Sequence, residues 1–97
     1  MVTFVVLAGF TDQGIRNVKE TIGRAEAFKE MAKKSGITVK DLYWTLGQYD
    51  QVCVFEAPDD QTAASVLLSA DTLGNIRTQT LRAFTSVEME KILANIP

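Results

Sequence analysis

The sequence predicts an α+β fold of the ferredoxin-like type, β-α-β-β-α-β with a short C-terminal helix, built on a four-stranded antiparallel sheet. Four short runs rich in β-branched and aromatic residues lie near 3–9, 41–46, 51–57 and 75–84, and segments of helical periodicity separate the first two and the last two. A polar break at 47–50 is so short that it can join only antiparallel neighbours. Right-handed crossovers then place strands 1 and 3 at the centre and both long helices on one face.

Length and composition limit the possibilities further. The 97 residues suffice for a single domain, 1–97, with one hydrophobic core, and 46% hydrophobic with 23% charged residues is typical of an ordered soluble protein. A formal charge of −2 offers no attraction to nucleic acid or to anionic membranes, so we expect neither as a partner. Cys53 is alone and no targeting or 18-residue apolar segment is visible, which predicts a cytoplasmic protein.

The first β-α pair begins with a strand over Thr3–Gly9 that is apolar enough to be buried on both faces. Asp12 is the expected N-cap of one long amphipathic helix, which should end before Gly36 in the left-handed region. Gly23 inside that helix costs about 0.8–1 kcal/mol relative to Ala, a cost that a close backbone contact would compensate. The apolar positions of the helix are Ile15, Val18, Ile22, Ala25, Phe28 and Ala32.

A hairpin follows, with strands over Asp41–Leu46 and Gln51–Ala57 and a turn at Gly47–Asp50. Pro58 ends the second strand because it has no N–H for the ladder. Cys53 lies within that apolar strand and is expected to be a buried small hydrophobe. Alternation places Leu42, Trp44 and Leu46 on one face of the first strand, and Tyr43 and Thr45 on the other.

The last third repeats the helix and strand and adds a terminal helix. Asp59 is a natural N-cap for a second amphipathic helix that ends at Gly74. Asn75–Phe84 should form a strand at a sheet edge, and Thr85 with Glu88 forms a capping-box pattern that opens a helix reaching Ile96. The apolar positions of the second helix are Ala63, Val66, Leu67, Ala70 and Leu73.

One face of such a sheet is left without helices, yet the central strands carry apolar residues on both faces, as Val5 and Leu7 show beside Phe4 and Val6. Something must cover that face. The simplest cover is a second copy stacked sheet to sheet across a two-fold axis, which predicts a homodimer with the dimeric α+β barrel arrangement.

The chain resembles the GYD domain family over nearly its whole length. The motif that gives the family its name corresponds here to Gly47-Gln48-Tyr49-Asp50, and further matching stretches are Tyr43-Trp44-Thr45-Leu46, Phe55-Glu56-Ala57-Pro58-Asp59-Asp60 and Leu73 to Phe84. The resemblance implies a ferredoxin-like, oligomeric domain with no assigned activity. It therefore strengthens the predicted fold and leaves the reaction, if any, open.

Few residues indicate chemistry. Without histidine, and without a Gly-rich phosphate loop, the sequence predicts neither a metal site nor a cofactor. Tyr49 and Asp50 would either orient a ligand or simply hold the turn, and Glu56 would form either an ion pair with Arg77 or Arg82 or the polar end of a pocket. The candidate pocket, a cleft between sheet and helices, comprises Tyr43, Trp44, Tyr49, Asp50, Glu56 and Arg82.

Three functions remain in competition. The leading hypothesis is a homo-oligomeric small-molecule-binding or interaction protein, whose partners are its own copies and a small-molecule ligand. The alternative is a cofactor-independent enzyme of the dimeric α+β barrel type, similar to a monooxygenase or an isomerase, which rests on analogy of fold. The third is a purely structural interaction module. Convergence of Tyr43, Tyr49, Glu56 and Arg82 on one enclosed cavity would favour the first two over the third.

Overall fold

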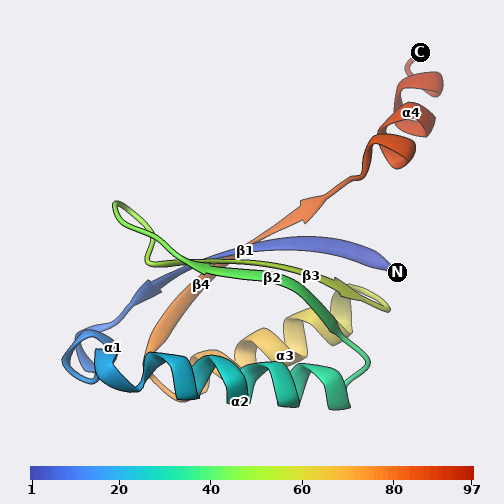
Figure 1. The fold of residues 1–97 in the computed structure, drawn as a ribbon. Coiled ribbons are helices and arrows are strands. Elements are labelled where there is room, and N and C mark those ends of the chain that lie inside the picture. The colour runs from blue at the N-terminus through green and yellow to red at the C-terminus, as the bar shows by residue number, and fades with distance from the viewer.

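The ferredoxin-like architecture is confirmed in the computed structural model, which describes all 97 residues. The sheet has the strand order β2-β3-β1-β4, and each neighbouring pair is antiparallel (Figure 1). Strands 1 and 3 are therefore central, and the last strand lies at an edge, as expected. The elements are β1 (Val2–Phe10), α1 (Asp12–Arg16), the short 3₁₀ turn η1 (Val18–Glu20), α2 (Thr21–Lys34), β2 (Thr38–Trp44), β3 (Gln51–Ala57), α3 (Asp60–Thr72), β4 (Ile76–Ala83) and α4 (Ser86–Ala94).

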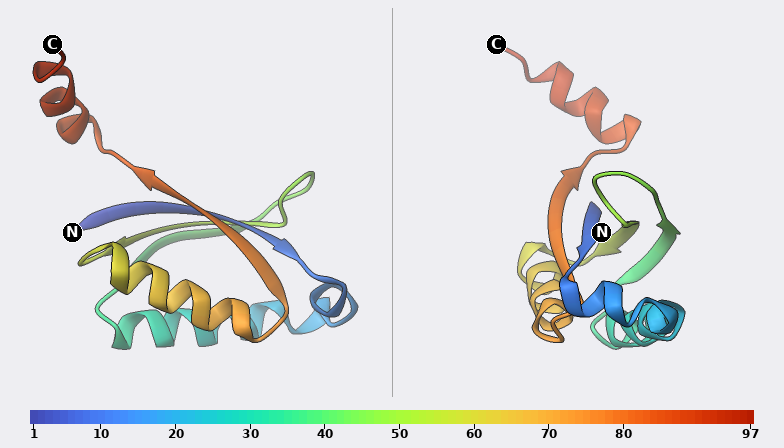
Figure 2. Two further views of the ribbon diagram at one scale, coloured as in Figure 1. Left: turned by 180° about the vertical axis from the view of Figure 1, so that it is seen from behind. Right: turned by 90° about the vertical axis from the view of Figure 1, so that its left-hand side faces the viewer.

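The two faces of the sheet differ in what covers them. Helices α2 and α3 lie along one face, and on the other side the end-on view shows only α4, which projects away from the sheet without covering it (Figure 2). In β1, Phe4, Val6 and Ala8 are buried towards the helices, whereas Val5 and Leu7 point to the open face and are only half-buried. The prediction that this strand is buried on both faces is thus wrong for the chain taken alone.

The most completely buried residues lie at the end of the sheet where the chain begins, which we call the packed end. Phe55 of β3 is fully buried, and its ring centre lies 5.6 Å from that of Phe4 in β1. Such tilted aromatic pairs contribute about 0.5–1.5 kcal/mol beyond the area that they bury. Ala32 at the end of α2 and Ala57 at the end of β3 are fully buried beside them.

The expected single helix from Asp12 to Lys34 is broken into three pieces. Thr11, not Asp12, is the N-cap, since its hydroxyl accepts a hydrogen bond from the Gly14 amide. The reason lies in a tertiary contact: a Cβ on Gly14 would stand 1.9 Å from the carbonyl oxygen of Asn75, so α1 is pressed against the start of β4. The apolar residues of this first part are consequently exposed, namely Ile15, Val18 and Ile22.

Of the predictions made for two glycines, the left-handed helix cap is confirmed and the close backbone contact is wrong. Gly36 ends α2 with φ of +80°, as predicted for a left-handed cap. Gly23 has open space where a Cβ would stand, so the close contact suggested as its compensation does not exist. The close backbone approach belongs to Gly14 instead.

The hairpin between β2 and β3 is longer than expected. β2 begins at Thr38, contains a bulge between Val39 and Asp41, and already ends at Trp44. The residues after Trp44 form a loop that rises away from the sheet (Figure 1), with Gly47 at φ of +108°. Leu46, expected to share a strand face with Leu42 and Trp44, is fully exposed in this loop.

The terminal helix α4 projects away from the rest of the molecule (Figures 1 and 2). The predicted capping box is present, with Thr85 and Glu88 each bonding the backbone amide of the other. None of its residues is buried, and its large apolar side chains are between 40% (Ile92) and 61% (Val87) exposed. None of the helices has the length and apolar character required to cross a bilayer.

Candidate functional site

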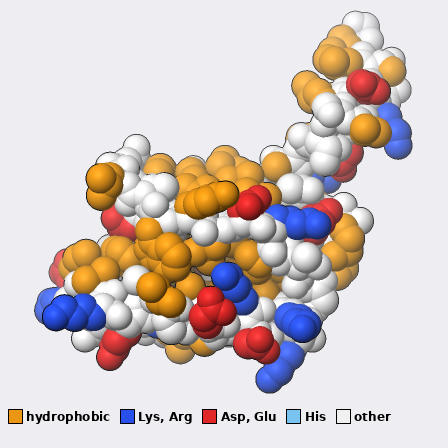
Figure 3. Space-filling view, in the orientation of Figure 1, with side chains coloured by type: hydrophobic (Ala, Val, Ile, Leu, Met, Phe, Trp, Pro, Cys, Tyr) orange, Lys and Arg blue, Asp and Glu red, His pale blue; other side chains and the backbone are white.

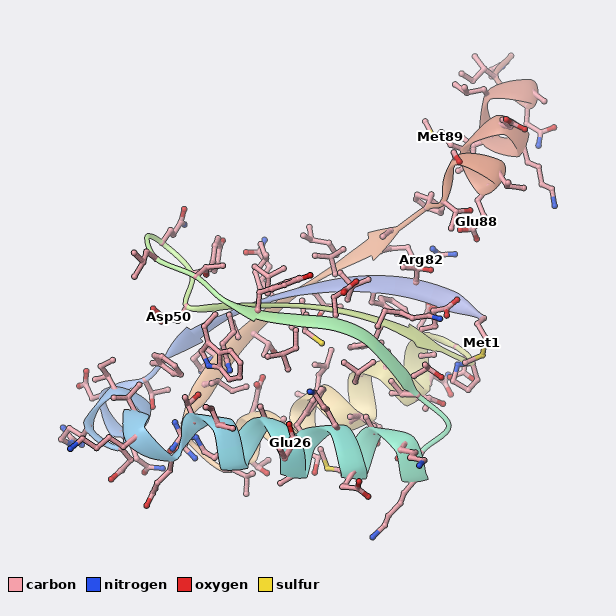
Figure 4. All side chains as sticks on the ribbon, viewed as in Figure 1. Met1, Glu26, Asp50, Arg82, Glu88 and Met89 are labelled. Carbon is pink, nitrogen blue, oxygen red and sulfur yellow. The ribbon has the colours of Figure 1, made fainter.

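The six predicted pocket residues do not meet in one place. Register places Tyr43 and Glu56 on the open face beside Val52 and Val54, whereas Arg82 pairs with Phe4 on the helix side. Figure 4 shows Asp50 near the hairpin loop and Arg82 near the base of α4, far from each other. No single cleft contains all six.

Asp50 acts as a structural tie at the end of β1. One of its carboxylate oxygens accepts a hydrogen bond of 2.7 Å from the Phe10 amide, and its own amide donates to the Ala8 carbonyl. Its carbonyl accepts from the Thr45 amide at 2.8 Å, which closes the hairpin loop. The carboxylate thus bonds an amide of the neighbouring strand rather than an amide of the turn.

Tyr49 and Trp44 each make one specific hydrogen bond. The Tyr49 hydroxyl donates to the Gln79 side-chain oxygen at 2.7 Å, joining the loop to β4 across the open face. The Trp44 indole N–H donates to the Thr21 hydroxyl at 3.0 Å, joining β2 to the start of α2. Tyr43 remains 61% exposed on the open face.

The two charged candidates pair with residues other than those expected. Glu56 lies 3.1 Å from Lys40, and Arg82 lies 3.7 Å from Glu88 at the base of α4. The Arg82 guanidinium also stands 4.5 Å from the centre of the Phe84 ring, a favourable cation–π distance. An ion pair between Glu56 and Arg77 or Arg82 does not form.

A cavity of about 250 Å³ lies between the sheet and the helices at the end opposite to the packed end. We call this region the cavity end. The strands contribute Val6, Ala8, Leu42 and Cys53, and the helices contribute small residues such as Ala25 and Ala70. Figure 3 shows the hydrophobic side chains gathered along the seam between the sheet and α2. None of the six predicted residues lines this cavity, although Trp44 bonds Thr21, which does.

The polar lining of the cavity is sparse and mostly neutral. Arg24 is the only lysine, arginine, aspartate or glutamate in the wall, and it is held by hydrogen bonds from its guanidinium to the carbonyls of Asn17 (2.9 Å) and Gly14 (3.4 Å). Burial raises the pKa of the Cys53 thiol to about 11, so this side chain stays neutral at physiological pH. The remaining polar residues of the wall are Thr21, Gln51, Asn75 and Thr78.

Sequence reasoning missed this cavity because its signal is the absence of bulk. Ala25 and Ala70 occupy core positions of the two helices, where Leu or Ile would fill the space. A shallower hollow on the open face contains one predicted residue, Tyr49, together with Leu7, Arg77 and Gln79. No group of three or more acidic or cysteine side chains stands close enough to hold a metal ion.

Comparison with known proteins supplies the family. Residues 4–93 match the GYD domain family. The chain belongs to this family. A relative from Thermus thermophilus, the "Glutamine synthetase and cystathionine beta-lyase binding protein", is 34% identical over 90 residues, which cover 92% of this chain and 95% of the relative.

Solved structures share the fold of this GYD domain. TTHA0845, also from Thermus thermophilus, superimposes with a TM-score of 0.63 and 25% identity, over 88% of this chain and 95% of that one. FFRP-DM1 superimposes with a TM-score of 0.61 and 22% identity, over 87% of this chain and all of the other. In the present GYD domain, the motif Gly47-Gln48-Tyr49-Asp50 ties the hairpin loop to β1 and β4.

Proposed function

We propose that this GYD domain is a homodimeric interaction protein that binds a metabolic enzyme. The observation that supports self-association is the apolar open face of the sheet. Val5 and Leu7 of β1 stand there beside Val54 and Val52 of β3, in direct register, and Leu81 of β4 extends the row. An apolar patch of this kind on a small protein indicates an interaction site.

A second copy suits this face because a two-fold axis lets the same patch cover itself. Stacked sheets bury their facing side chains in a layer about 10 Å thick, which would suit the half-buried valines of the central strands. The exposed apolar side chains of α4, which projects beyond the sheet, add further uncovered surface. Both features favour an assembly larger than one chain.

The proposed partner enzyme comes from the relative. That protein carries the name of a protein that binds glutamine synthetase and cystathionine β-lyase, and it aligns with almost the whole of this chain. We propose that this chain binds the same kind of enzyme. The enzymatic alternative has less support, because the cavity wall offers only Arg24 and a Cys53 thiol whose raised pKa makes it a poor nucleophile.

The molar mass of the protein in solution tests whether it forms a dimer. Light scattering at micromolar concentration should give about twice the chain mass of 10.7 kDa. Val54→Asp places a charge in the open face and should yield monomers, whereas Leu68→Asp, on the exposed side of α3, should leave the dimer intact. A wild-type mass near 10.7 kDa would refute the dimer.

Enzyme binding is tested separately. Purified glutamine synthetase and cystathionine β-lyase from the organism that encodes this chain would each be titrated with it by calorimetry. We expect at least one of them to bind with a dissociation constant in the micromolar range or below. Absence of heat and of co-elution for both enzymes, with an intact dimer, would refute the partner while leaving the assembly unaffected.

A further inference from the structure

The cavity end has the properties of a ligand site that is distinct from the open face. At about 250 Å³ it exceeds the roughly 150 Å³ cavity that is known to accept benzene in another protein. It therefore has room for an aromatic ring with a short substituent. Its position between sheet and helices separates it from the surface proposed for self-association.

The hydrophobic lining of the cavity determines which part of a ligand can be enclosed. Twelve of the seventeen lining residues are hydrophobic, and they surround the cavity from both layers. Val6 and Cys53 come from the central strands, and Ala25 and Leu67 come from the helices. Because small apolar cavities disfavour charged or strongly hydrated groups, the part of the ligand inside must be apolar.

The polar residues of the wall gather at one side. Arg24 bonds the Gly14 carbonyl, and Gly14 packs against Asn75, which places Arg24 and Asn75 near each other. Thr21 precedes Arg24 by one turn of α2 and bonds Trp44, whose strand partner Gln51 also lines the cavity. Any polar group of the ligand is therefore expected on this side.

The charge of Arg24 selects the kind of polar group. Its side chain is 22% exposed, and its nearest carboxylate, Glu20, lies 3.9 Å away and points mostly into solvent. Two backbone carbonyls orient the guanidinium but carry no formal charge to balance it. A guanidinium has five N–H donors and prefers carboxylates, with which it forms paired, charge-assisted hydrogen bonds.

We propose that this cavity binds a small monocarboxylic acid with a compact apolar body, of the aryl-acid class, with its carboxylate on Arg24. No acidic side chain lines the wall: Asp71 lies behind Thr78, which donates a hydrogen bond to it at 3.0 Å, and Glu20 lies on the solvent side of Arg24, so Arg24 is the site in the wall that favours an anion. A second carboxylate would have to enter the apolar interior, which disfavours dicarboxylates.

The experiment uses phenylacetate as the probe, with phenylacetamide as its neutral isostere. Calorimetry and amide chemical shifts of the full chain should show phenylacetate binding about tenfold more tightly than phenylacetamide, since one charge-assisted contact is worth at least about 1.4 kcal/mol. The shifted amides should cluster at Ala25, Cys53 and Ala70. Equal affinities for the two probes, or no binding at millimolar concentration, would overturn the proposal.

Two variants locate the site. Arg24→Gln should lower the affinity for phenylacetate to that for phenylacetamide, whereas Lys29→Gln, which removes a cation of the same helix that does not line the cavity, should change neither. Ala70→Leu fills the cavity and should abolish binding of both probes; if that variant does not fold, Ala25→Val is the milder filling. Unchanged binding of phenylacetate by a folded variant with a filled cavity would refute the cavity as the ligand site. The proposals of the dimer and of enzyme binding would not be affected by that result.

Discussion

The packed end and the cavity end of the sheet–helix layer are built from the same four elements, yet one is filled and the other is hollow. At the packed end, β1 and β3 supply Phe4 and Phe55, which fill the space beneath the helices. At the cavity end, the same strands supply Ala8 and Cys53. Side-chain volume along each strand, not the backbone, therefore decides which end stabilises the fold and which end can receive a ligand.

The helices reinforce this division because they run antiparallel. The end of α2 and the start of α3 lie at the packed end, where Ala32 and Ala63 bring the helices close to the sheet. The start of α2 and the end of α3 border the cavity with Arg24 and Ala70. Stability and binding should consequently respond to different substitutions.

The largest expected difference is between Phe55→Ala and Leu73→Ala. Phe55 is fully buried, so its truncation should lower the free energy of unfolding by about 3–5 kcal/mol. Leu73 lines the cavity but is 66% exposed, so its truncation should cost less than about 1 kcal/mol. Urea unfolding of both variants measures the two values. Equal losses would show that the two ends are packed alike.

Cys53 belongs to the cavity wall next to the buried core, and the titration of its thiol reports how well water is excluded there. Burial raises the pKa of its thiol from 9.0 to about 11 in the folded chain. Below the unfolded pKa both states are protonated, and above it the unfolded state loses its proton first, so stability falls as pH rises towards 11. Between about pH 8 and pH 10, the free energy of unfolding of the wild type should fall by about 1.4 kcal/mol more than that of Cys53→Ala. Parallel urea curves for the two proteins at both pH values would contradict this.

Two glycines near the cavity end should respond in opposite ways to substitution by alanine. Gly14→Ala would force a Cβ to within 1.9 Å of the Asn75 carbonyl oxygen and should cost about 1–3 kcal/mol. Gly23→Ala meets open space within a helix and should stabilise by up to about 1 kcal/mol. Thermal melts should therefore shift in opposite directions. A melting temperature of Gly14→Ala equal to or above that of the wild type would mean that α1 does not rest on Asn75, and a lower one for Gly23→Ala would contradict the open space at that position.

The sequence predicts best those structural features that are determined by residues adjacent in the chain. The Asp59 cap, the Gly36 and Gly74 helix ends and the Thr85–Glu88 capping box are each specified by adjacent residues, and all were predicted correctly. The break of the first helix was not, because it arises from a contact between Gly14 and a segment far along the chain.

The candidate pocket shows the same limit. The predicted pocket was based on polar and aromatic residues near the family motif, yet Tyr49 and Asp50 form hydrogen bonds with Gln79 and Phe10 within the fold. The cavity depends on the summed volumes of side chains from β1, β3, α2 and α3, a quantity that no local pattern encodes. For the same reason, helical periodicity alone assigns Arg24 to the solvated face of its helix.

The smallest expected effect concerns the cap at the packed end. Hydrogen bonds from Thr62 lower the pKa of the Asp59 carboxyl below 3.8 in the folded chain. The cap therefore stabilises the fold fully above the unfolded-state pKa of this carboxyl, and this stabilisation is lost as the pH falls through the folded-state pKa. Asp59→Asn keeps a good capping residue but cannot titrate, so the wild type should lose stability faster than this variant below about pH 4. If Asp59→Asn lost stability at acid pH as steeply as the wild type, the hydrogen bonds from Thr62 would not be holding the Asp59 carboxyl in its ionised form, contrary to the structure.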